Sequence, residues 1–195
     1  RGHRVVFVED GHVVTIEGSL QQRLSLTDVP LTAGGLLSFQ IENTLAAVGA
    51  CWALDMPWPS IVEGICSFHN DSANAPGRFN LMSYRNATIV ADYGHNPHAM
   101  RALVAAFDAL PTTATSKRTV VISGAGDRRD EDLRELTRVL GSAFDNIILF
   151  EDACQRGRSD CEVIQLLREG LNGASRTTHV QDIQGEFNAI DTALA

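Results

Sequence analysis

The stretch "TVVISGAGDRRDEDLRELTRVL", residues 119–140, contains the pattern that decides the fold. It begins with a continuous apolar run, Thr119–Ser123, which is typical of a strand with both sheet faces covered. A glycine-containing polar loop follows, and leucines then recur at the spacing of one helix face. Asp130 is predicted to cap this helix, because a short acidic side chain can accept from free N–H groups in its first turn. The stretch therefore predicts a strand, a loop and a helix in succession.

The same succession recurs along the second half of the chain. Asn96 and Pro97 suit the cap and the first position of a helix. Alternating strands and helices predict an α/β fold with a Rossmann-like, mostly parallel sheet. The strands are expected at Thr88–Asp92, Asn146–Phe150 and Thr177–Val180, and the helices at Pro97–Leu110, Glu162–Leu171 and Gln184–Leu194.

The first third of the chain has a different pattern. Arg4–Val8 and His12–Glu17 are rich in β-formers and are separated by Asp-Gly, which predicts a hairpin. Helices are expected at Phe39–Leu54 and after Pro57. Residues 69–77, "HNDSANAPG", are polar and rich in turn formers, which is typical of a linker. We therefore expect an α+β segment over residues 1–76 and the Rossmann-like domain over residues 77–195.

The composition restricts the partners. The 195 residues carry a net charge of −8, which argues against a general nucleic-acid or membrane-surface binder. No apolar run reaches the roughly 18 to 20 residues of a membrane span. The four cysteines lack C-x-x-C spacing and indicate reduced thiols in a cytoplasmic protein. Because the chain starts at Arg1 inside a strand pattern, it is expected to be a piece of a longer protein.

Polar clusters follow the predicted strands at three places. They are Asp92–Asn96, Gly124–Asp132 and Glu151–Arg158. In open α/β sheets, ligands bind outside the carboxyl ends of the strands. We therefore expect all three clusters to face one edge of the same sheet.

The first cluster allows more than one interpretation. Asp92 could end its strand and Asn96 could cap the next helix, or the carboxylate could accept from a ribose hydroxyl. His95 and His98 do not predict a metal site, because no third ligand is evident.

The other two clusters are also open to a plain interpretation. Asp127–Asp130 could be a solvated charge run, and Gly124 and Gly126 alone are weak evidence for phosphate binding. Arg156 and Arg158 could form a guanidinium fork for a carboxylate or phosphate, or could pair with the neighbouring Glu151 or Asp152.

Six motifs in order resemble the Mur ligase superfamily, and within it the Mur-type ligase region of the cyanophycin synthetases. The resemblance covers nearly the whole chain. The motifs are "PLTAGG" at 30–35, "ENTLAA" at 42–47, "PGRFN" at 76–80, "DYGHNP" at 92–97, "GDRRDED" at 126–132 and "RGR" at 156–158.

The resemblance implies roles on the ATP side of a cleft. Asn43 would lie near the adenine, and Arg78 would reach toward the phosphates. Asp92 would bind the ribose, with His95 and Asn96 beside the nucleotide. The amino-acid side would be lined by Asp127, Arg128, Arg129, Asp130, Arg156 and Arg158.

The resemblance also implies a reaction, which is ATP- and Mg²⁺-dependent amide formation through an acyl phosphate. In the cyanophycin type, arginine is joined to aspartate side chains of a poly-aspartate backbone, and the full-length protein is expected to be a homo-oligomer. The chain lacks the phosphate-binding motif G-x-x-x-x-G-K-[ST]. We expect this loop upstream in the remainder of a truncated central ATPase domain, and we expect the fragment alone to be inactive.

Other functions remain open at this point. The chain could be a non-catalytic amino-acid-binding or scaffold module from a split or degenerate gene. It could also belong to a Mur-type ligase for folate or a peptidoglycan precursor. A dehydrogenase is disfavoured, because the full dinucleotide-binding glycine fingerprint is absent.

Overall fold

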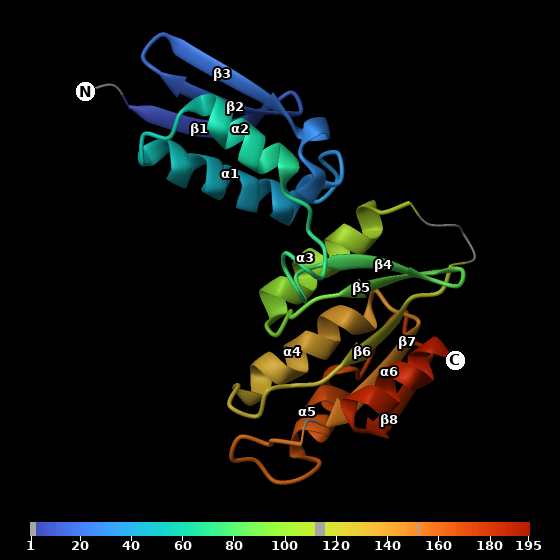
Figure 1. The fold of residues 1–195 in the computed structure, drawn as a ribbon. Coiled ribbons are helices and arrows are strands. Elements are labelled where there is room, and N and C mark those ends of the chain that lie inside the picture. The colour runs from blue at the N-terminus through green and yellow to red at the C-terminus, as the bar shows by residue number, and fades with distance from the viewer. Residues whose placement is uncertain (1–2, 112–115, 152) are drawn as a thin grey trace. The chain divides into compact units, whose positions relative to one another are not determined.

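The computed structural model describes residues 3–111, 116–151 and 153–195. The chain forms two compact units, Arg1–Tyr93 and Gly94–Ala195, and each is described by itself (Figure 1). No helix within the described ranges is long and apolar enough to cross a membrane.

The first unit begins with an antiparallel sheet in the order β1-β2-β3. The strands are β1 (Arg4–Glu9), β2 (His12–Glu17) and β3 (Leu20–Ser25). Asp10 and Gly11 join β1 to β2 with φ angles of 50° and 71°, as a primed hairpin turn requires. The predicted hairpin is confirmed, whereas β3 was not predicted, because its polar run Gln21–Arg23 lacks the β-formers of its neighbours.

Two helices pack on this sheet (Figure 1). They are α1 (Ser38–Ala53) and α2 (Trp58–Ser67), which confirms both predicted helices. Short 3-10 turns, η1 (Leu26–Asp28) and η2 (Pro30–Thr32), lead from β3 toward α1. The core of this region consists of Val13, Leu24, Leu26, Val29, Val48, Trp52 and Ile61.

The strand before "DYGHNP" is placed differently from the prediction. It exists as β5 (Ala87–Ala91), but it pairs antiparallel with β4 (Asn80–Tyr84) in a separate sheet. Within the described residues β5 is therefore not a strand of the parallel sheet, and that prediction was wrong. The cause is local: two turn residues, Arg85 and Asn86, let the chain fold straight back on β4.

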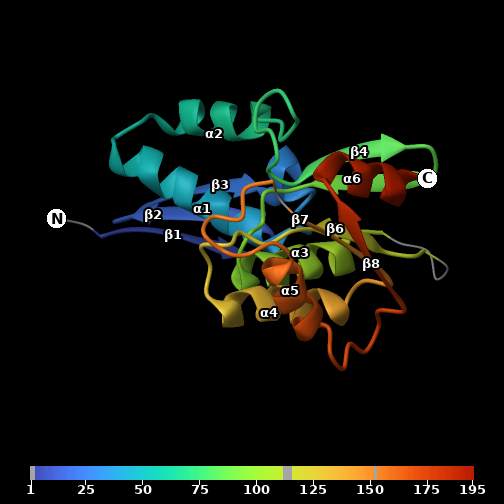
Figure 2. The ribbon, with the colours of Figure 1, turned by 90° about the horizontal axis from the view of Figure 1, so that it is seen from below.

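The second unit contains a parallel sheet in the order β6-β7-β8. The strands are β6 (Thr119–Ile122), β7 (Asn146–Glu151) and β8 (His179–Gln184). Within this unit, Figure 2 shows the C-terminal helix on one face of the sheet and the other helices of the unit on the opposite face. This arrangement confirms the α/β fold with a parallel sheet, preceded by an antiparallel β/α region. The helices are α3 (Pro97–Ala109), α4 (Asp130–Gly141), α5 (Glu162–Gly170) and α6 (Glu186–Leu194).

The core of the second unit holds α4 closely against α5. A Cβ atom on Gly170 would lie only 2.0 Å from the main-chain oxygen of Arg134, so only glycine fits there. Nearby, the buried hydroxyl of Thr137 donates to the main-chain oxygen of Leu167 at 2.6 Å. These contacts fix the two helices that follow β6 and β7, and so fix the loops that lead into them.

Candidate functional site

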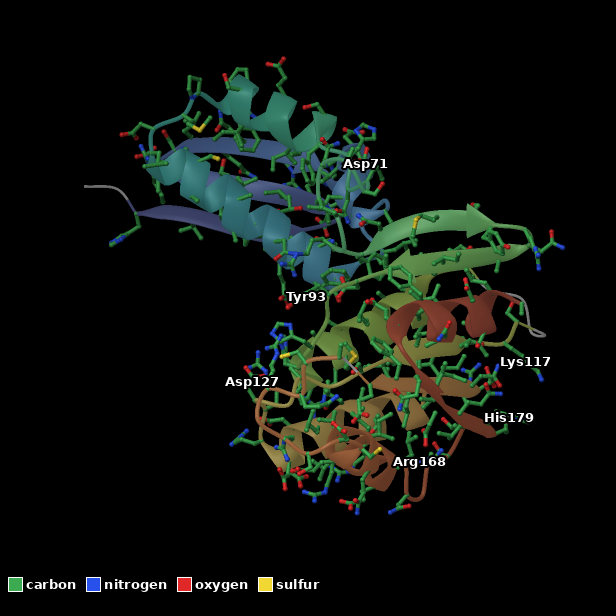
Figure 3. All side chains as sticks on the ribbon, turned by 60° about the horizontal axis from the view of Figure 1, so that its bottom comes forward. Asp71, Tyr93, Lys117, Asp127, Arg168 and His179 are labelled. Atoms are coloured by element: carbon green, nitrogen blue, oxygen red, sulfur yellow. The ribbon has the colours of Figure 1, made fainter. Side chains whose placement is uncertain are left out.

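Two loops meet at the carboxyl edge of the parallel sheet. One joins β6 to α4 and contains Asp127, and the other joins β7 to α5. A Cβ atom on Gly126 would lie 2.1 Å from the main-chain oxygen of Gln155. The two loops can therefore lie this close together only because Gly126 has no side chain. Figure 3 shows Asp127 at this end of the sheet, with Lys117 and His179 at the other end.

Arg158 ties these loops together. Its Nε donates to the main-chain oxygen of Gly126 at 2.7 Å, and its Nη2 donates to that of Arg128 at 2.7 Å. Nη2 also donates to Asp130 at 2.8 Å, and Nη1 donates to Glu162 at 2.7 Å. The side chain is only 15% exposed. These two carboxylates raise the pKa of the Arg158 guanidinium, Asp130 more strongly than Glu162.

Arg156 makes a much looser pair with Asp127. One nitrogen, Nη1, donates to both carboxylate oxygens of Asp127 at 3.3 Å. The Arg156 side chain is 44% exposed and that of Asp127 is 52% exposed. An exposed pair at this distance contributes little stability and can open for a ligand.

The remaining charges of the motif have separate environments. Arg129 donates from Nε and Nη2 to Asp132 at 2.8 Å, and this contact lowers the pKa of Asp132. Arg128 is exposed. Asp130 was expected to cap α4, but it is the first helical residue and Arg129 occupies the cap position. The prediction of an Asp130 cap was therefore wrong, because the extended backbone of a cap residue lies one position earlier, at Arg129, with φ −66° and ψ 148°.

Within the described residues, the two arginines have partners other than Glu151. Arg156 and Arg158 pair with Asp127, Asp130 and Glu162, and Glu151 accepts from the main-chain N–H of Cys161 at 2.5 Å. Asp152, the other suggested partner, lies outside the described residues.

Arg78 lies in an ordered loop of the first unit. Its guanidinium carbon is 5.3 Å from the ring centroid of Tyr93, which is a cation–π contact. The neighbouring Asn80 is buried, accepts from Gly77 N at 2.8 Å and donates to the main-chain oxygens of Asn70 and Ala75. The polar "linker" is thus a hydrogen-bonded loop that holds the backbone around Arg78.

The other residues predicted on the ATP side are distributed over both units. Asn43 lies exposed on α1 and donates to Gln40 Oε1 at 3.0 Å. Asp92 belongs to the first unit, whereas His95 and Asn96 belong to the second. Asn96 accepts from Ala99 N at 2.9 Å, which confirms it as the cap of α3.

Comparison with known proteins decides the family. The family model described as "Mur ligase, glutamate ligase domain" matches residues 77–195. The chain belongs to the Mur ligase family. A cyanophycin synthetase of Synechocystis sp. (strain ATCC 27184 / PCC 6803 / Kazusa) is 34% identical over 187 residues, which is 95% of this chain and 21% of that protein. One from Nostoc sp. (strain PCC 7120 / SAG 25.82 / UTEX 2576) is 32% identical over all 195 residues.

A solved structure supports the fold of this Mur ligase chain. Mycobacterium tuberculosis folylpolyglutamate synthase, complexed with ADP and AMPPCP, matches with a TM-score of 0.65 and 20% identity. The match covers 98% of this chain and 39% of that protein. The chain spans about a fifth of the length of the curated cyanophycin synthetases.

The Mur ligase reaction uses ATP and Mg²⁺, and the described residues do not fit the metal. Residues 3–111, 116–151 and 153–195 contain no group of three or more histidine, cysteine or acidic side chains that could hold a metal ion. The sequence also has no Walker-type loop to supply a Mg²⁺ ligand. We therefore assign no step of the reaction to a metal held by this chain.

Three residues that contact the predicted residues, one in the second unit and two in the first, were missed from the sequence. Glu162 lies four residues after Arg158, and that spacing alone could have suggested the pair. Tyr93 stands beside the singled-out Asp92 and carries an aromatic face for Arg78. Asn80 gave no sequence signal, because its three main-chain partners become neighbours only when the loop closes.

A shallow hollow lies at the opposite, amino edge of the same sheet. Its volume is about 220 Å³, and its lining includes Thr119, Asn146, His179 and Gln181. Asn146 Nδ2 donates to Thr119 Oγ1 at 3.0 Å inside it. Among the residues that the structure describes, the lining has no Asp, Glu, Lys or Arg side chain, so the carboxyl edge is the better candidate for charged substrates.

Proposed function

We propose that this chain supplies the amino-acid side, and part of the ATP side, of the active site of an ATP-dependent amide ligase of the cyanophycin type. The product bond would join the α-amine of arginine to an aspartate side chain of a poly-aspartate backbone. We place the family's C-terminal domain at residues 77–195, and the end of a central ATP-binding domain at residues 1–76. The Asp127–Arg156 pair carries the proposal, because it offers both charges, loosely paired and exposed, at the carboxyl edge.

This pair suits a cationic amino acid. When it opens, the Arg156 guanidinium can bind a carboxylate, and the Asp127 carboxylate can bind the guanidinium of a substrate arginine. Arg128 adds a further exposed positive charge near the same loop. The protein groups would therefore orient the α-amine toward the activated carbonyl, which is the main contribution that binding makes to such a reaction.

In the proposed reaction, this chain binds and orients the substrates and supplies no catalytic group. The aspartate carboxylate would form an O–P bond to the γ-phosphoryl group of ATP, and ADP would leave. The arginine α-amine would then form the C–N bond, the C–O bond to phosphate would break, phosphate would leave, and the amine proton would pass to solvent. Arg78 and Asp92 would hold the phosphates and ribose of ATP. Because no P-loop is present in these residues, the 195-residue chain alone should show no turnover.

A pair of variants tests the two sides of this proposal. In the full-length protein that carries this chain, Arg156→Ala should raise the KM for the amino acid about tenfold and leave the KM for ATP nearly unchanged. Asp92→Ala should do the opposite. Equal effects of both variants on the same KM would contradict a site with separate ATP and amino-acid sides.

The substrate is tested separately. The full-length protein should incorporate arginine on a poly-aspartate primer and consume ATP in a 1:1 ratio for that step. Glutamate, lysine and diaminopimelate, offered alone under the same conditions, should be incorporated much more slowly. Preferential use of another amino acid would retain the ligase and contradict the assignment of arginine.

A further inference from the structure

We propose that Arg158 is a positioning residue which holds the Asp127 and Arg156 loops together and does not bind the substrate. This inference rests on the proposed function, since it concerns the amino-acid side of that site. The sequence presents Arg156 and Arg158 as one fork, whereas the structure gives them different environments.

The hydrogen bonds of Arg158 carry the inference. Each of its three guanidinium nitrogens donates, with distances of 2.7 to 2.8 Å. The acceptors Gly126, Arg128 and Asp130 lie 28 to 32 residues away in sequence, so each bond crosses from one loop to the other. A substrate carboxylate would have to displace partners that already use the planar fork of this side chain.

Glu162, at the start of α5, completes the contacts of Arg158. We call Arg158 and its partners Gly126, Arg128, Asp130 and Glu162 the clamp. Its Oε1 accepts from Arg158 Nη1, and its Oε2 accepts from the main-chain N–H of Ser159 at 3.1 Å. Both contacts lower the pKa of Glu162, with the Arg158 contact the larger cause. The carboxylate therefore fixes both the guanidinium and the backbone that follows it.

The clamp sets the distance between the exposed groups that bind substrate. Asp127 directly follows Gly126, whose carbonyl is held by Arg158 Nε, and Arg156 lies two residues before Arg158. Gly126 packs so closely on Gln155 that no side chain fits between the loops. Loosening Arg158 would therefore separate Asp127 from Arg156 and weaken the binding of a ligand that needs both.

Lysine cannot replace this arginine. Its ammonium is a single point of donation on a flexible stem, whereas the clamp needs donors in several directions of one plane. Arg134 provides a matched control in the same unit, since its Nε donates to Glu169 at 2.8 Å between α4 and α5. Arg134→Lys keeps that charge pair and changes no contact of the two loops.

The kinetic test uses the full-length protein. Arg158→Lys should raise the KM for the amino acid about tenfold, with the KM for ATP within twofold, and Arg134→Lys should change neither value. The double variant Asp130→Asn with Glu162→Gln frees the Arg158 guanidinium from its carboxylates. A clamp predicts that this variant also raises the amino-acid KM. A lowered or unchanged amino-acid KM would overturn the proposal. If Arg158 bound the substrate, removing the two carboxylates that compete for its guanidinium would strengthen substrate binding.

A second measurement does not depend on catalysis. In the 195-residue chain, Arg158→Lys should speed hydrogen exchange at residues 124–130 and 154–159 at least fivefold, while the second half of α4 stays protected. Unchanged exchange in these loops would overturn the clamp even if the ligase is active. Faster exchange in this chain, together with a full-length protein that shows no ligase activity on arginine and a poly-aspartate primer, would uphold the clamp and refute the proposed function.

Discussion

The two edges of the parallel sheet use the same residue types in opposite ways. At the amino edge, Asp145 is the centre: it accepts from Arg118 N at 2.8 Å and from Arg176 Nη2 at 2.9 Å. At the carboxyl edge, Arg158 is the centre and gathers carbonyls and carboxylates from both loops. At the amino edge, an acidic residue therefore connects the segments that lead into the strands. At the carboxyl edge, an arginine connects the two loops that leave the strands.

The difference lies in what each network leaves exposed. The Arg176 guanidinium is paired with Asp145, and the Arg118 guanidinium is paired with Asp108, while Arg118 contacts Asp145 only through its main-chain N–H. Around Arg158, the loops still present the half-exposed Asp127 and Arg156 to solvent. We infer that the amino edge serves stability and the carboxyl edge serves binding, which agrees with the general location of ligands in such sheets.

The largest effect on stability and on the amino-acid KM is expected from a glycine-to-alanine substitution at the carboxyl edge. Gly126→Ala brings a Cβ to 2.1 Å from a main-chain oxygen, so the loops must separate. We expect a loss of about 2 to 3 kcal/mol in the free energy of unfolding. In the full-length protein, the amino-acid KM should rise at least tenfold.

Gly141→Ala is the matched change near the amino edge. Its Cβ would meet the Cβ of Ala174 at 2.9 Å, which is a milder clash. Denaturant unfolding should show a smaller loss of stability, and both KM values should stay unchanged. An amino-acid KM that rises equally in the two variants would remove the distinction between the edges.

The next effect concerns stability alone. Asp145→Asn weakens charged hydrogen bonds to Arg176 and Arg118, and should cost about 1 to 2 kcal/mol, allowing for the partly exposed Arg176. Urea unfolding of the 195-residue chain measures this. The substrate KM values of the full-length variant should match the unmodified protein, and a changed amino-acid KM would show that the amino edge takes part in binding.

The pH dependence of that stability loss follows from the same contacts. The Arg176 guanidinium, followed by the Arg118 N–H, lowers the pKa of Asp145 in the folded chain. The stabilisation is therefore complete above the unfolded pKa of about 3.9, and it is lost as the pH falls through the lower folded value. The stability difference between the unmodified chain and Asp145→Asn should be constant from pH 5 to 7 and should shrink below about pH 4. A difference that grows on acidification would contradict this pairing.

The smallest effect is expected at Arg129. Its side chain is 83% exposed and already paired with Asp132 on the same helix turn. Arg129→Ala should change the amino-acid KM less than twofold, whereas Arg128→Ala should raise it several-fold. The reverse order would show that the helix-bound arginine is the one that meets the substrate.

Local patterns in the sequence were sufficient to predict most of the fold. The Asp10-Gly11 turn, the Asn96 cap and the leucine face of α4 are short-range features, and the structure shows all three. β5 was predicted as a strand but assigned to the wrong sheet, and its antiparallel partner β4 was not predicted. The pattern within one strand does not say which other strand it pairs with.

The site was predictable only in part for the same reason. The position of charged residues after β6 and β7 predicts that they gather at one edge, and the structure brings Asp127 and Asp130 to Arg156 and Arg158. Arg158 is held by hydrogen bonds to residues that lie 28 to 32 positions away in the sequence. No local pattern contains such contacts, so the unequal roles of Arg156 and Arg158 emerge only from the folded chain.

The most direct test of the contrast between the edges is hydrogen exchange of the full-length protein with and without arginine, in the presence of a non-hydrolysable ATP analogue and a poly-aspartate primer. The account predicts slower exchange at residues 124–130 and 154–159, with no change at the amino-edge residues 117–119, 145–146 and 176–181. Protection confined to the amino edge, or no protection of either edge at saturating arginine, would contradict it.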